Sequence, residues 1–417
     1  MGLTTGRRML LSVICAVAVA QIYVAQPVLA QIGADLGFPE SATGWIVTTG
    51  QLGYLTGLVL LVPLGNIFDR RKLIAGHLLL AAFGMALTAV AVQVWLLLAG
   101  LALAGLFAVV VQTTVAFAAE LSTAAERGRT LGAVTSGVTI GILGARVLAG
   151  SLAALWGWRS IYVVFALLLA ALIPLVLRLL PSDPRGVQPA YGAVMLSLGR
   201  MFRERLFVSR GLIAFFLFAS FGTLWSGLTL PLAAEPWQLS TAQIGFFGIA
   251  GLAGALGARR AGQWADAGHS SAITGGALVL LAASWLASGQ ASRSLWLVIV
   301  GVIVLDFAVQ AVHVSNQHLL VSAYPHRTSS AIGGYMLFYS LGSAVGAAGT
   351  TAAYSAAGWA ASSLLGAVFA LSALLVWALN RHAGADTQRD VLPRPPRGVP
   401  HEGGAHPPQA SRRCSTR

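Results

Sequence analysis

Charged residues are scarce in this chain of 417 residues. Asp, Glu, Lys and Arg together make up 9% of the sequence, whereas soluble domains average about a quarter. That scarcity, with 57% apolar residues, excludes an ordinary soluble globule. Apolar segments recur along the chain, and at about 20 residues each could cross a bilayer as a helix. The alternating segments of a membrane β-barrel are missing, so the sequence predicts an all-α, multi-pass membrane protein.

Cysteine and the usual catalytic clusters are also rare. Cys15 lies in an apolar segment and Cys414 in the C-terminal tail, so no disulfide framework is implied. His313 and His318 are five residues apart, and no carboxylate or cysteine completes a metal site with them. A nucleotide-binding loop of the G-x-x-x-x-G-K-[ST] type is missing too. We therefore expect no enzyme, no metal and no cofactor, and no direct use of ATP.

Twelve segments qualify as membrane spans. The first is too long, and too polar at Gln21 and Gln26, for a cleaved signal peptide. The predicted spans are residues 9–30, 43–64, 73–93, 95–119, 131–155, 160–180, 210–233, 241–262, 271–290, 295–320, 331–355 and 360–380.

The basic residues predict the orientation of these spans. With both termini in the cytoplasm, all but three of the 26 lysines and arginines fall on the cytoplasmic side. The exceptions are Arg159 and Arg293 in external loops and Arg146 inside a span. The net charge of +13 then reflects topology and attraction to anionic lipid rather than nucleic-acid binding. We expect a monomer in the cell (inner) membrane whose partners are lipid and a small-molecule substrate.

The two halves of the chain resemble each other at a nearly constant offset of about 200 residues. The matching elements are "LFAVVVQ" (106–112) with "DFAVQAV" (306–312), Arg127 with Arg327, Gly157–Trp158 with Gly358–Trp359, and "GNIFD" (65–69) with "GQWAD" (262–266). Four matches in the same order indicate an internal duplication.

The duplication predicts four regions. Residues 1–180 form one six-helix bundle and residues 210–380 a second, joined by a cytoplasmic linker at 181–209. Residues 381–417 form a Pro-, Gly- and Arg-rich tail that we expect to be disordered and cytoplasmic. Parallel repeats of this kind are typical of transporters, with the binding site between the halves near the middle of the membrane.

The loop between the second and third spans carries a family resemblance. It reads "GNIFDRRK", in which Gly65, Asp69 and Arg70 match the signature G-x-x-x-D-[RK]-x-G-[RK]-[RK], although the x-G pair is missing. Over residues 9–380 the chain therefore resembles the major facilitator superfamily. The resemblance implies two pseudo-symmetric six-helix bundles that work by alternating access. The spaced glycines of the fifth span, Gly137, Gly141 and Gly144, resemble those of proton-coupled exporters, although the exporter proline is absent.

Two loops are candidate gates. Gly65 allows a tight turn out of a helix, and Asp69 can cap the next helix and face the positive N-terminal end of a neighbouring one. Arg70 belongs to the basic run that holds the loop in the cytoplasm. The second-half loop "GQWADAGH" keeps Gly262 and Asp266 but has lost the basic residues. Both loops could serve only as caps and topology anchors; the resemblance implies that they also latch the cytoplasmic side.

The tenth span carries polar residues on one helical stripe. Asp306, Gln310, His313 and Gln317 are spaced i, i+4, i+7 and i+11, and Asn316 lies beside them. A charge at the bilayer centre costs about 2.5–3.5 kcal/mol on insertion scales, so the stripe should face a cavity or the other half. His313 could be a satisfied buried histidine, a proton carrier or a substrate ligand.

Arg146 and Asp306 lie at similar predicted depths, about 14–16 Å from the external ends of their helices. The sequence shows no other basic residue and no other acid equally deep in the predicted spans. Three hypotheses follow: an ion pair between the halves, local partners for each residue, or separate contacts with substrate. Further polar or aromatic residues could line the same cavity, or pack between helices: Gln21, Tyr23, Gln26, Gln51, Tyr54, Gln112, Thr113, Trp225, Tyr335 and Tyr339.

The resemblance implies proton-coupled efflux of a small organic molecule, such as a drug-like compound, a sugar or a nucleoside-like metabolite. Coupling needs a group that changes protonation, and Asp306 is the candidate. Two alternatives stay open: an importer of the same fold, and a membrane sensor that signals through the basic tail and transports nothing.

Overall fold

The computed structural model describes residues 4–123, 127–182, 191–264, 270–324 and 328–391. Within these ranges the chain forms helices joined by short turns, and no strand occurs. The first part comprises α1 (Thr5–Tyr23), η1 (Gln26–Val28), α2 (Leu29–Leu36), η2 (Glu40–Ala42), α3 (Gly44–Leu60), η3 (Val62–Asn66), α4 (Arg70–Ala89), α5 (Val94–Phe107), α6 (Val110–Glu120), α7 (Arg127–Trp156) and α8 (Arg159–Leu179). The second part comprises α9 (Tyr191–Met201), α10 (Arg205–Gly227), α11 (Thr229–Ala233), α12 (Thr241–Trp264), α13 (Ser270–Ser288), α14 (Leu295–Ala323) and α15 (Thr328–Val391).

Every predicted span overlaps one of these helices. Eight helical stretches among the described residues are long and apolar enough to cross a membrane, and two shorter apolar helices lie at Thr241–Gly254 and Ala272–Ser288. The last two predicted spans share α15, which is interrupted by non-helical backbone at Ala357 and Gly358. Gly358 has φ of +66°, a left-handed conformation that costs glycine little, so the chain turns there between two long helices.

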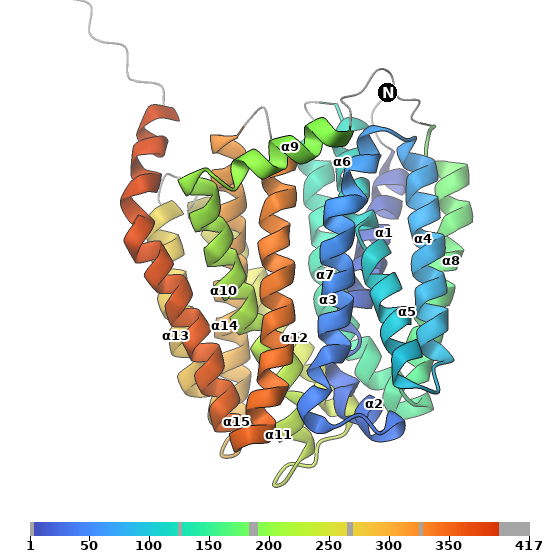
Figure 1. The fold of residues 1–417 in the computed structure, drawn as a ribbon, viewed down its shortest axis with the longest axis vertical. Coiled ribbons are helices and arrows are strands. Elements are labelled where there is room, and N and C mark those ends of the chain that lie inside the picture. Colours follow the sequence, from blue (N-terminus) through green and yellow to red (C-terminus); the bar gives the residue numbers. More distant parts are fainter. Residues whose placement is uncertain (1–3, 124–126, 183–190, 265–269, 325–327, 392–417) are drawn as a thin grey trace, which may run out of the picture.

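The long helices stand side by side (Figure 1). Helices α1 to α8 occupy one side of the molecule and α10 to α15 the other, while α9 lies across one end. The short helices α2 and α11 lie at the opposite end. We refer to these as the α9 end and the α2/α11 end.

Small residues bring the two groups of helices into close contact. A Cβ on Gly44 of α3 would lie 2.1 Å from the carbonyl oxygen of Ala347 in α15, and a Cβ on Gly150 of α7 would lie 2.3 Å from the carbonyl oxygen of Thr241 in α12. Only glycine permits such an approach of two backbones. Both contacts lie toward the α2/α11 end, so the two groups of helices are tightly packed there.

Two helix boundaries differ from the sequence-based expectations. The helix predicted to start at residue 210 starts at Arg205, which places Arg210 inside the helix rather than at its first position. At the other end, α15 continues past residue 380 to Val391, so the first part of the expected disordered tail is helical. A helix that is already long adds residues at little cost, because each one gains a hydrogen bond without a new nucleation step. Residues 392–417 lie outside the described residues.

Candidate functional site

Arg146 is a deeply buried cation in the first group of helices. It lies in α7 with 1% of its surface exposed. Its Nε donates to Oε1 of Gln26, 3.0 Å away, and its Nη1 donates to the carbonyl oxygen of Ile142 at 3.1 Å. Gln26 sits where the chain passes from α1 into α2, so this break in the first helix supplies the arginine with an acceptor.

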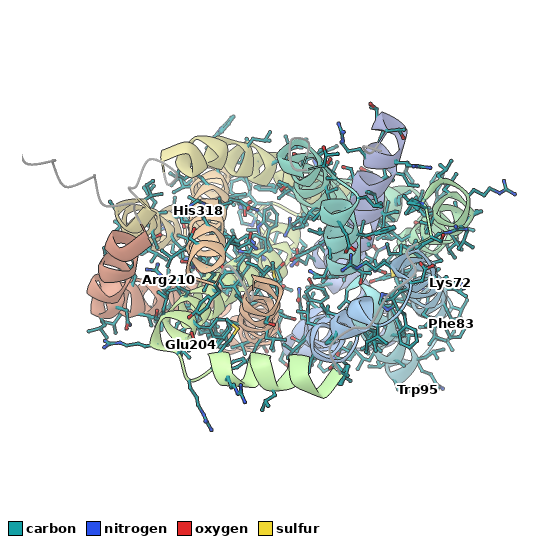
Figure 2. All side chains as sticks on the ribbon, turned by 90° about the horizontal axis from the view of Figure 1, so that it is seen from above. Lys72, Phe83, Trp95, Glu204, Arg210 and His318 are labelled. Atoms are coloured by element: carbon teal, nitrogen blue, oxygen red, sulfur yellow. The ribbon has the colours of Figure 1, made fainter. Side chains whose placement is uncertain are left out.

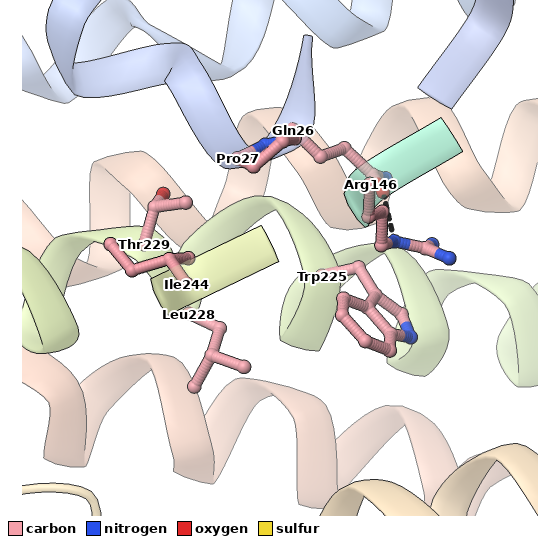
Figure 3. Close-up of a pocket in the computed structure, with 7 residues that line it drawn as sticks. All are labelled: Gln26, Pro27, Arg146, Trp225, Leu228, Thr229 and Ile244. Atoms are coloured by element: carbon pink, nitrogen blue, oxygen red, sulfur yellow. Dashed lines mark hydrogen bonds between the residues drawn. The ribbon is translucent and has the colours of Figure 1, made fainter. Parts of the chain in front are cut away.

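Trp225 links Arg146 to Asp306. The guanidinium carbon of Arg146 lies 3.8 Å from the centre of the Trp225 ring, within the range of a cation–π interaction. The indole Nε1 of Trp225 donates to Oδ1 of Asp306 at 3.2 Å. The three side chains come from α7, α10 and α14. Figure 3 shows Arg146 beside the indole of Trp225, with its hydrogen bond to Gln26.

The hypothesis of a direct ion pair between Arg146 and Asp306 is therefore corrected to a bridged arrangement. Among the described residues no salt bridge joins these two side chains; the pairs found are Arg70–Glu120 and Arg159–Asp35. The two charges still interact electrostatically. The flat indole accounts for the difference, because it satisfies the cation with its face and the carboxylate with its N–H. Trp225 thus contacts protein groups rather than only offering a surface to a ligand.

Glycines of α12 make room for these charges. A Cβ on Gly248 would lie 3.2 Å from Cβ of Arg146. A Cβ on Gly251 would lie 2.3 Å from Oδ2 of Asp306 and 2.9 Å from Cζ2 of Trp225. Oδ2 of Asp306 is buried and has no hydrogen-bond partner among the described residues. One oxygen of this carboxylate is therefore held by protein and the other is free to bind a proton.

A small pocket adjoins Arg146 and Trp225 (Figure 3). It lies between the helix break near Gln26 and the α10–α11–α12 segment, so residues from both groups of helices enclose it. Its lining is mostly apolar apart from Arg146, Gln26 and a threonine. The lining residues are Gln26, Pro27, Arg146, Trp225, Leu228, Thr229 and Ile244.

Tyrosines meet across the two groups of helices. The hydroxyl of Tyr23 in α1 contacts that of Tyr339 in α15. The Tyr339 ring also packs on Phe218 of α10, with ring centres 4.0 Å apart. Nearby, Gln112 of α6 donates to the Tyr54 hydroxyl of α3 at 2.6 Å. The predicted residues Tyr23, Gln112 and Tyr339 are thus placed in the interior, two of them in contact.

The polar stripe of the tenth predicted span lies on α14, and its members reach different partners. His313 Nδ1 is 3.1 Å from the Tyr335 hydroxyl, and its Nε2 is 3.2 Å from the side-chain amide nitrogen Nε2 of Gln317. Phe218 meets the His313 ring edge-on with ring centres 5.2 Å apart. Asp306 belongs instead to the Trp225 bridge. Gln310 is half-buried between these two sites.

The burial of Arg210 was missed by the sequence analysis, which placed this residue at the cytoplasmic start of a predicted span and treated Arg146 as the one deep cation. In the structure Arg210 lies on α10 with 5% of its surface exposed. Its Nη1 donates to Oδ1 of Asn316 on α14, 3.3 Å away. An available signal was the Phe207–Gly211–Ala214–Phe218 pattern, an apolar helical face that extends the helix to Arg205 and turns Arg210 toward the bundle.

The first gate loop lies at the α9 end. Asp69 caps α4, because its carboxylate accepts from the backbone N–H of Arg71 at 2.8 Å and of Lys72 at 3.4 Å. Arg70 forms an ion pair with Glu120 of α6 and donates to the Gly65 carbonyl oxygen at 3.1 Å. The capping role is thus confirmed. In the second loop, Asp266 lies outside the described residues, and Gly262 lies in the last turn of α12.

The described residues contain no group of three or more His, Cys, Asp or Glu side chains that could hold a metal ion. The Trp225 bridge and the polar stripe of α14, with its partner Arg210, therefore offer two arginines, one carboxylate, one histidine and hydroxyl and amide groups. Such groups can bind a polar molecule and exchange a proton.

Comparison with known proteins decides the family. The model of the Major Facilitator Superfamily matches residues 11–322 and 211–409. The chain belongs to the major facilitator superfamily. It is 41% identical over 369 residues to the transporter YgaY of Escherichia coli strain K12, covering 88% of this chain and 94% of YgaY. It is 30% identical over 319 residues to the transporter SCO4007 of Streptomyces coelicolor, covering 75% and 73%.

Solved structures show the same superfamily fold. The chain matches a bacterial homologue of the human lysosomal transporter Spinster, in an inward-facing and unoccupied conformation, with a TM-score of 0.67. The match covers 92% of this chain and 96% of the other at 15% identity, which supports the fold alone. The chain is thus a multi-pass membrane transporter of the major facilitator superfamily, as the loop signature predicted.

Proposed function

We propose that this transporter exports a small organic molecule in exchange for protons, by alternating access of two six-helix bundles that together cross the membrane twelve times. The observation that carries the proposal is the Arg146–Trp225–Asp306 bridge. It joins α7 to α10 and α14 in the interior. If Asp306 gains or loses a proton, the attraction between the two groups of helices changes. Coupling of proton binding to the conformational change requires such an effect.

Asp306 is the proton site in this proposal. It is the only buried acid among the described residues, with 2% of its surface exposed. A proton binds Oδ2, which has no protein partner in the described part of the chain, while Oδ1 keeps the Trp225 N–H. Protonation removes the negative charge beside Arg146. The attraction between the two side chains is then lost, and deprotonation of Asp306 restores it.

The packing at the α2/α11 end supports an alternating-access cycle. There α3 meets α15 at Gly44 and at Thr48, whose hydroxyl donates to the Ala344 carbonyl oxygen at 3.0 Å. The Spinster homologue with the same fold is inward-facing. We infer that this structure likewise represents a state closed at the α2/α11 end, which the basic-residue pattern assigns to the outside of the inner membrane.

The gate loop is proposed to latch the α9 end in the opposite state. Asp69→Asn should keep the protein expressed but weaken closure there, so cysteines placed at inward-facing positions should react faster with a thiol reagent. Unchanged reactivity with normal transport would leave Asp69 as a helix cap only. Asp266→Asn should act in the same direction but more weakly, because its loop has lost the basic residues.

Proton coupling is tested with Asp306→Asn. In everted vesicles with an imposed pH gradient, the wild type should dissipate the gradient when transported compounds are added, and Asp306→Asn should not. Exchange of labelled compound without a gradient should persist in the variant. Glu235→Gln, at an exposed acid, is the matched control. Accumulation against a gradient by Asp306→Asn would remove this residue from the proton path.

A substitution at His313 tests whether this residue acts outside the proton path. His313→Gln should change apparent affinity or pH optimum rather than abolish flux, because His313 contacts Tyr335 and Gln317 and not the Asp306 bridge.

The direction of transport, and the alternative of a sensor, are tested separately. Uptake in right-side-out vesicles driven by an inward proton gradient would indicate an importer. A sensor would lose its output on deletion of the tail after residue 380, whereas a transporter should keep its flux.

A further inference from the structure

Arg210, labelled in Figure 2, is a buried cation without a counter-charge in the described part of the chain. Its side chain is 5% exposed, and among the described residues it forms no ion pair with any acid. Its one hydrogen bond runs from Nη1 to the amide oxygen of Asn316, at 3.3 Å. Its Nε is enclosed and has no acceptor in the described part of the chain. A neutral amide oxygen compensates a guanidinium only in part, so the described surroundings of Arg210 leave part of its positive charge uncompensated.

Asn316 presents a second unused donor at the same place. It is fully buried, with 0% exposure. Its Oδ1 is occupied by Arg210, whereas its Nδ2 makes no hydrogen bond of normal geometry among the described residues and has only the Tyr335 hydroxyl near it. Within the described part of the chain, two buried N–H donors from neighbouring side chains on α10 and α14 thus lack a well-placed acceptor. Burying unpaired donors is costly, and a bound oxyanion would satisfy both.

Aromatic rings flank this pair of residues. Tyr335 packs in the same buried cluster as Phe207 and Ala214, which lie one helical turn on either side of Arg210. The Tyr335 hydroxyl bonds His313, whose ring meets Phe218. An organic molecule with its anionic end at Arg210 would therefore have rings beside its apolar part.

We propose that Arg210 and Asn316 bind the carboxylate of a small organic anion, which is the class of substrate this transporter carries. The assignment of this anion as a substrate rests on the proposed transport function. The binding site itself is inferred from the contacts of Arg210 and Asn316. Arg210 is five residues from the start of α10, or about 7–8 Å along the helix. That start lies at the α9 end, the predicted cytoplasmic side, so an exported anion would meet Arg210 early on its path.

The first test measures binding with benzoate as the probe and benzamide as its neutral, equally sized counterpart. In purified protein at constant ionic strength, benzoate should raise the thermal unfolding temperature of the wild type and benzamide should not. Arg210→Gln should weaken the apparent benzoate affinity about tenfold or more, because it removes a charge-assisted hydrogen bond. The control is Arg205→Gln, an exposed arginine on the same helix bonded to Asn380; it should respond as the wild type does.

The second test supplies the missing charge from within the protein. Asn316→Asp keeps the side-chain shape and places a carboxylate against Arg210. The variant should unfold at a higher temperature than the wild type without any ligand, and should no longer respond to benzoate. A lowered unfolding temperature with the benzoate response retained would overturn the proposal, since Arg210 would then not lack a counter-charge. Arg210→Lys keeps the charge if Arg210→Gln fails to fold.

A phospholipid phosphate offers similar chemistry, and a third comparison distinguishes it. The wild type and Arg210→Gln are reconstituted in nanodiscs of phosphatidylcholine alone and with phosphatidylglycerol added, and inorganic phosphate is tested in detergent. Stabilisation by phosphatidylglycerol that depends on Arg210, without an effect of benzoate, would overturn the substrate assignment in favour of a lipid. Failure of Asp306→Asn to uncouple transport would leave the benzoate results unaffected, so the two proposals fail separately.

Discussion

Arg146 and Arg210 are both buried arginines, yet their surroundings differ. Arg146 has an amide oxygen, a backbone carbonyl, an indole face and, through that indole, the Asp306 carboxylate. Arg210 has the Asn316 amide oxygen and no acid within the described residues. The first cation belongs to a contact between the two groups of helices, and the second lies wholly among α10, α14 and α15.

The difference separates two uses of a buried charge. A cation with a built-in carboxylate can respond to a proton, because protonation of the acid changes the balance. A cation without one needs an anion from outside the protein to be compensated. We therefore assign coupling to Arg146 and Asp306, and substrate recognition to Arg210 and Asn316. Four predictions, from the largest expected effect to the smallest, test this division.

Replacement of each arginine by alanine should give the largest difference in stability between the two sites. Arg146→Ala leaves Asp306 buried without its cation and should lower the free energy of unfolding by roughly 3–5 kcal/mol. Arg210→Ala leaves only a neutral amide and should cost about 1 kcal/mol. The double variant Arg146→Ala/Asp306→Ala should cost less than the sum of its single variants. Unfolding in mixed micelles measures these variants together with Asp306→Ala. Proton-driven transport should be absent in Arg146→Ala, in Asp306→Ala and in the double variant.

Strictly additive losses at Arg146 and Asp306 would show that Trp225 does not couple them. An equal loss at Arg146 and Arg210 would contradict the comparison itself, since both cations would then be compensated to the same degree.

Removal of the indole N–H should have the next largest effect. Trp225→Phe keeps a ring beside Arg146 but leaves Asp306 without its donor, at a cost of roughly 1.5–3 kcal/mol for a hydrogen bond to a charged group. The control is Trp285→Phe, because Nε1 of Trp285 donates to the neutral Ser220 hydroxyl at 2.8 Å; it should cost about 1 kcal/mol. The same loss in both variants would indicate that Asp306 is not charged when bonded to Trp225.

A methyl group placed beside the carboxylate tests the packing of the bridge. Gly251→Ala would put its Cβ 2.3 Å from Oδ2 of Asp306, so Asp306 or Trp225 must move. Overpacking of this kind costs about 1–3 kcal/mol. Gly144→Ala on α7 has nothing within 4 Å of its new Cβ and should be neutral or slightly stabilising. Thermal unfolding distinguishes them, and equal behaviour would mean that α12 is not held against Asp306.

An arginine at the rim should give the smallest effect. Arg70 pairs with Glu120, whose side chain is 52% exposed. Water screens that carboxylate, so Glu120→Gln should lower the free energy of unfolding by less than about 1 kcal/mol. The measurement should be repeated at high salt, where the difference from the wild type should shrink. A loss as large as that at Asp306 would show that exposure does not set the strength of these pairs.

Much of the site was accessible from sequence, for reasons of spacing. The stripe on α14 follows from the helical period, and the His313–Gln317 contact confirms it. The capping role of Asp69 follows from its position before a basic helical segment. The burial of Arg210 was missed because Arg200, Arg203 and Arg205 precede it, and the charge pattern placed the whole set at the cytoplasmic face. The place of Trp225 was missed because a tryptophan is equally compatible with lipid, ligand or a charged neighbour.

The sequence by itself determined the helical class, the positions of the apolar helices and the superfamily. Each of these depends on local properties: the length of an apolar run, its scarcity of charge, and a short loop signature. Only the tertiary structure decided that Trp225 joins Arg146 to Asp306 and that Arg210 faces Asn316 without an acid. Those contacts depend on how each helix is rotated and which helices are neighbours. Packing of small residues such as Gly248 and Gly251 sets both, and residues on α7, α10 and α14 meet only after that packing is complete.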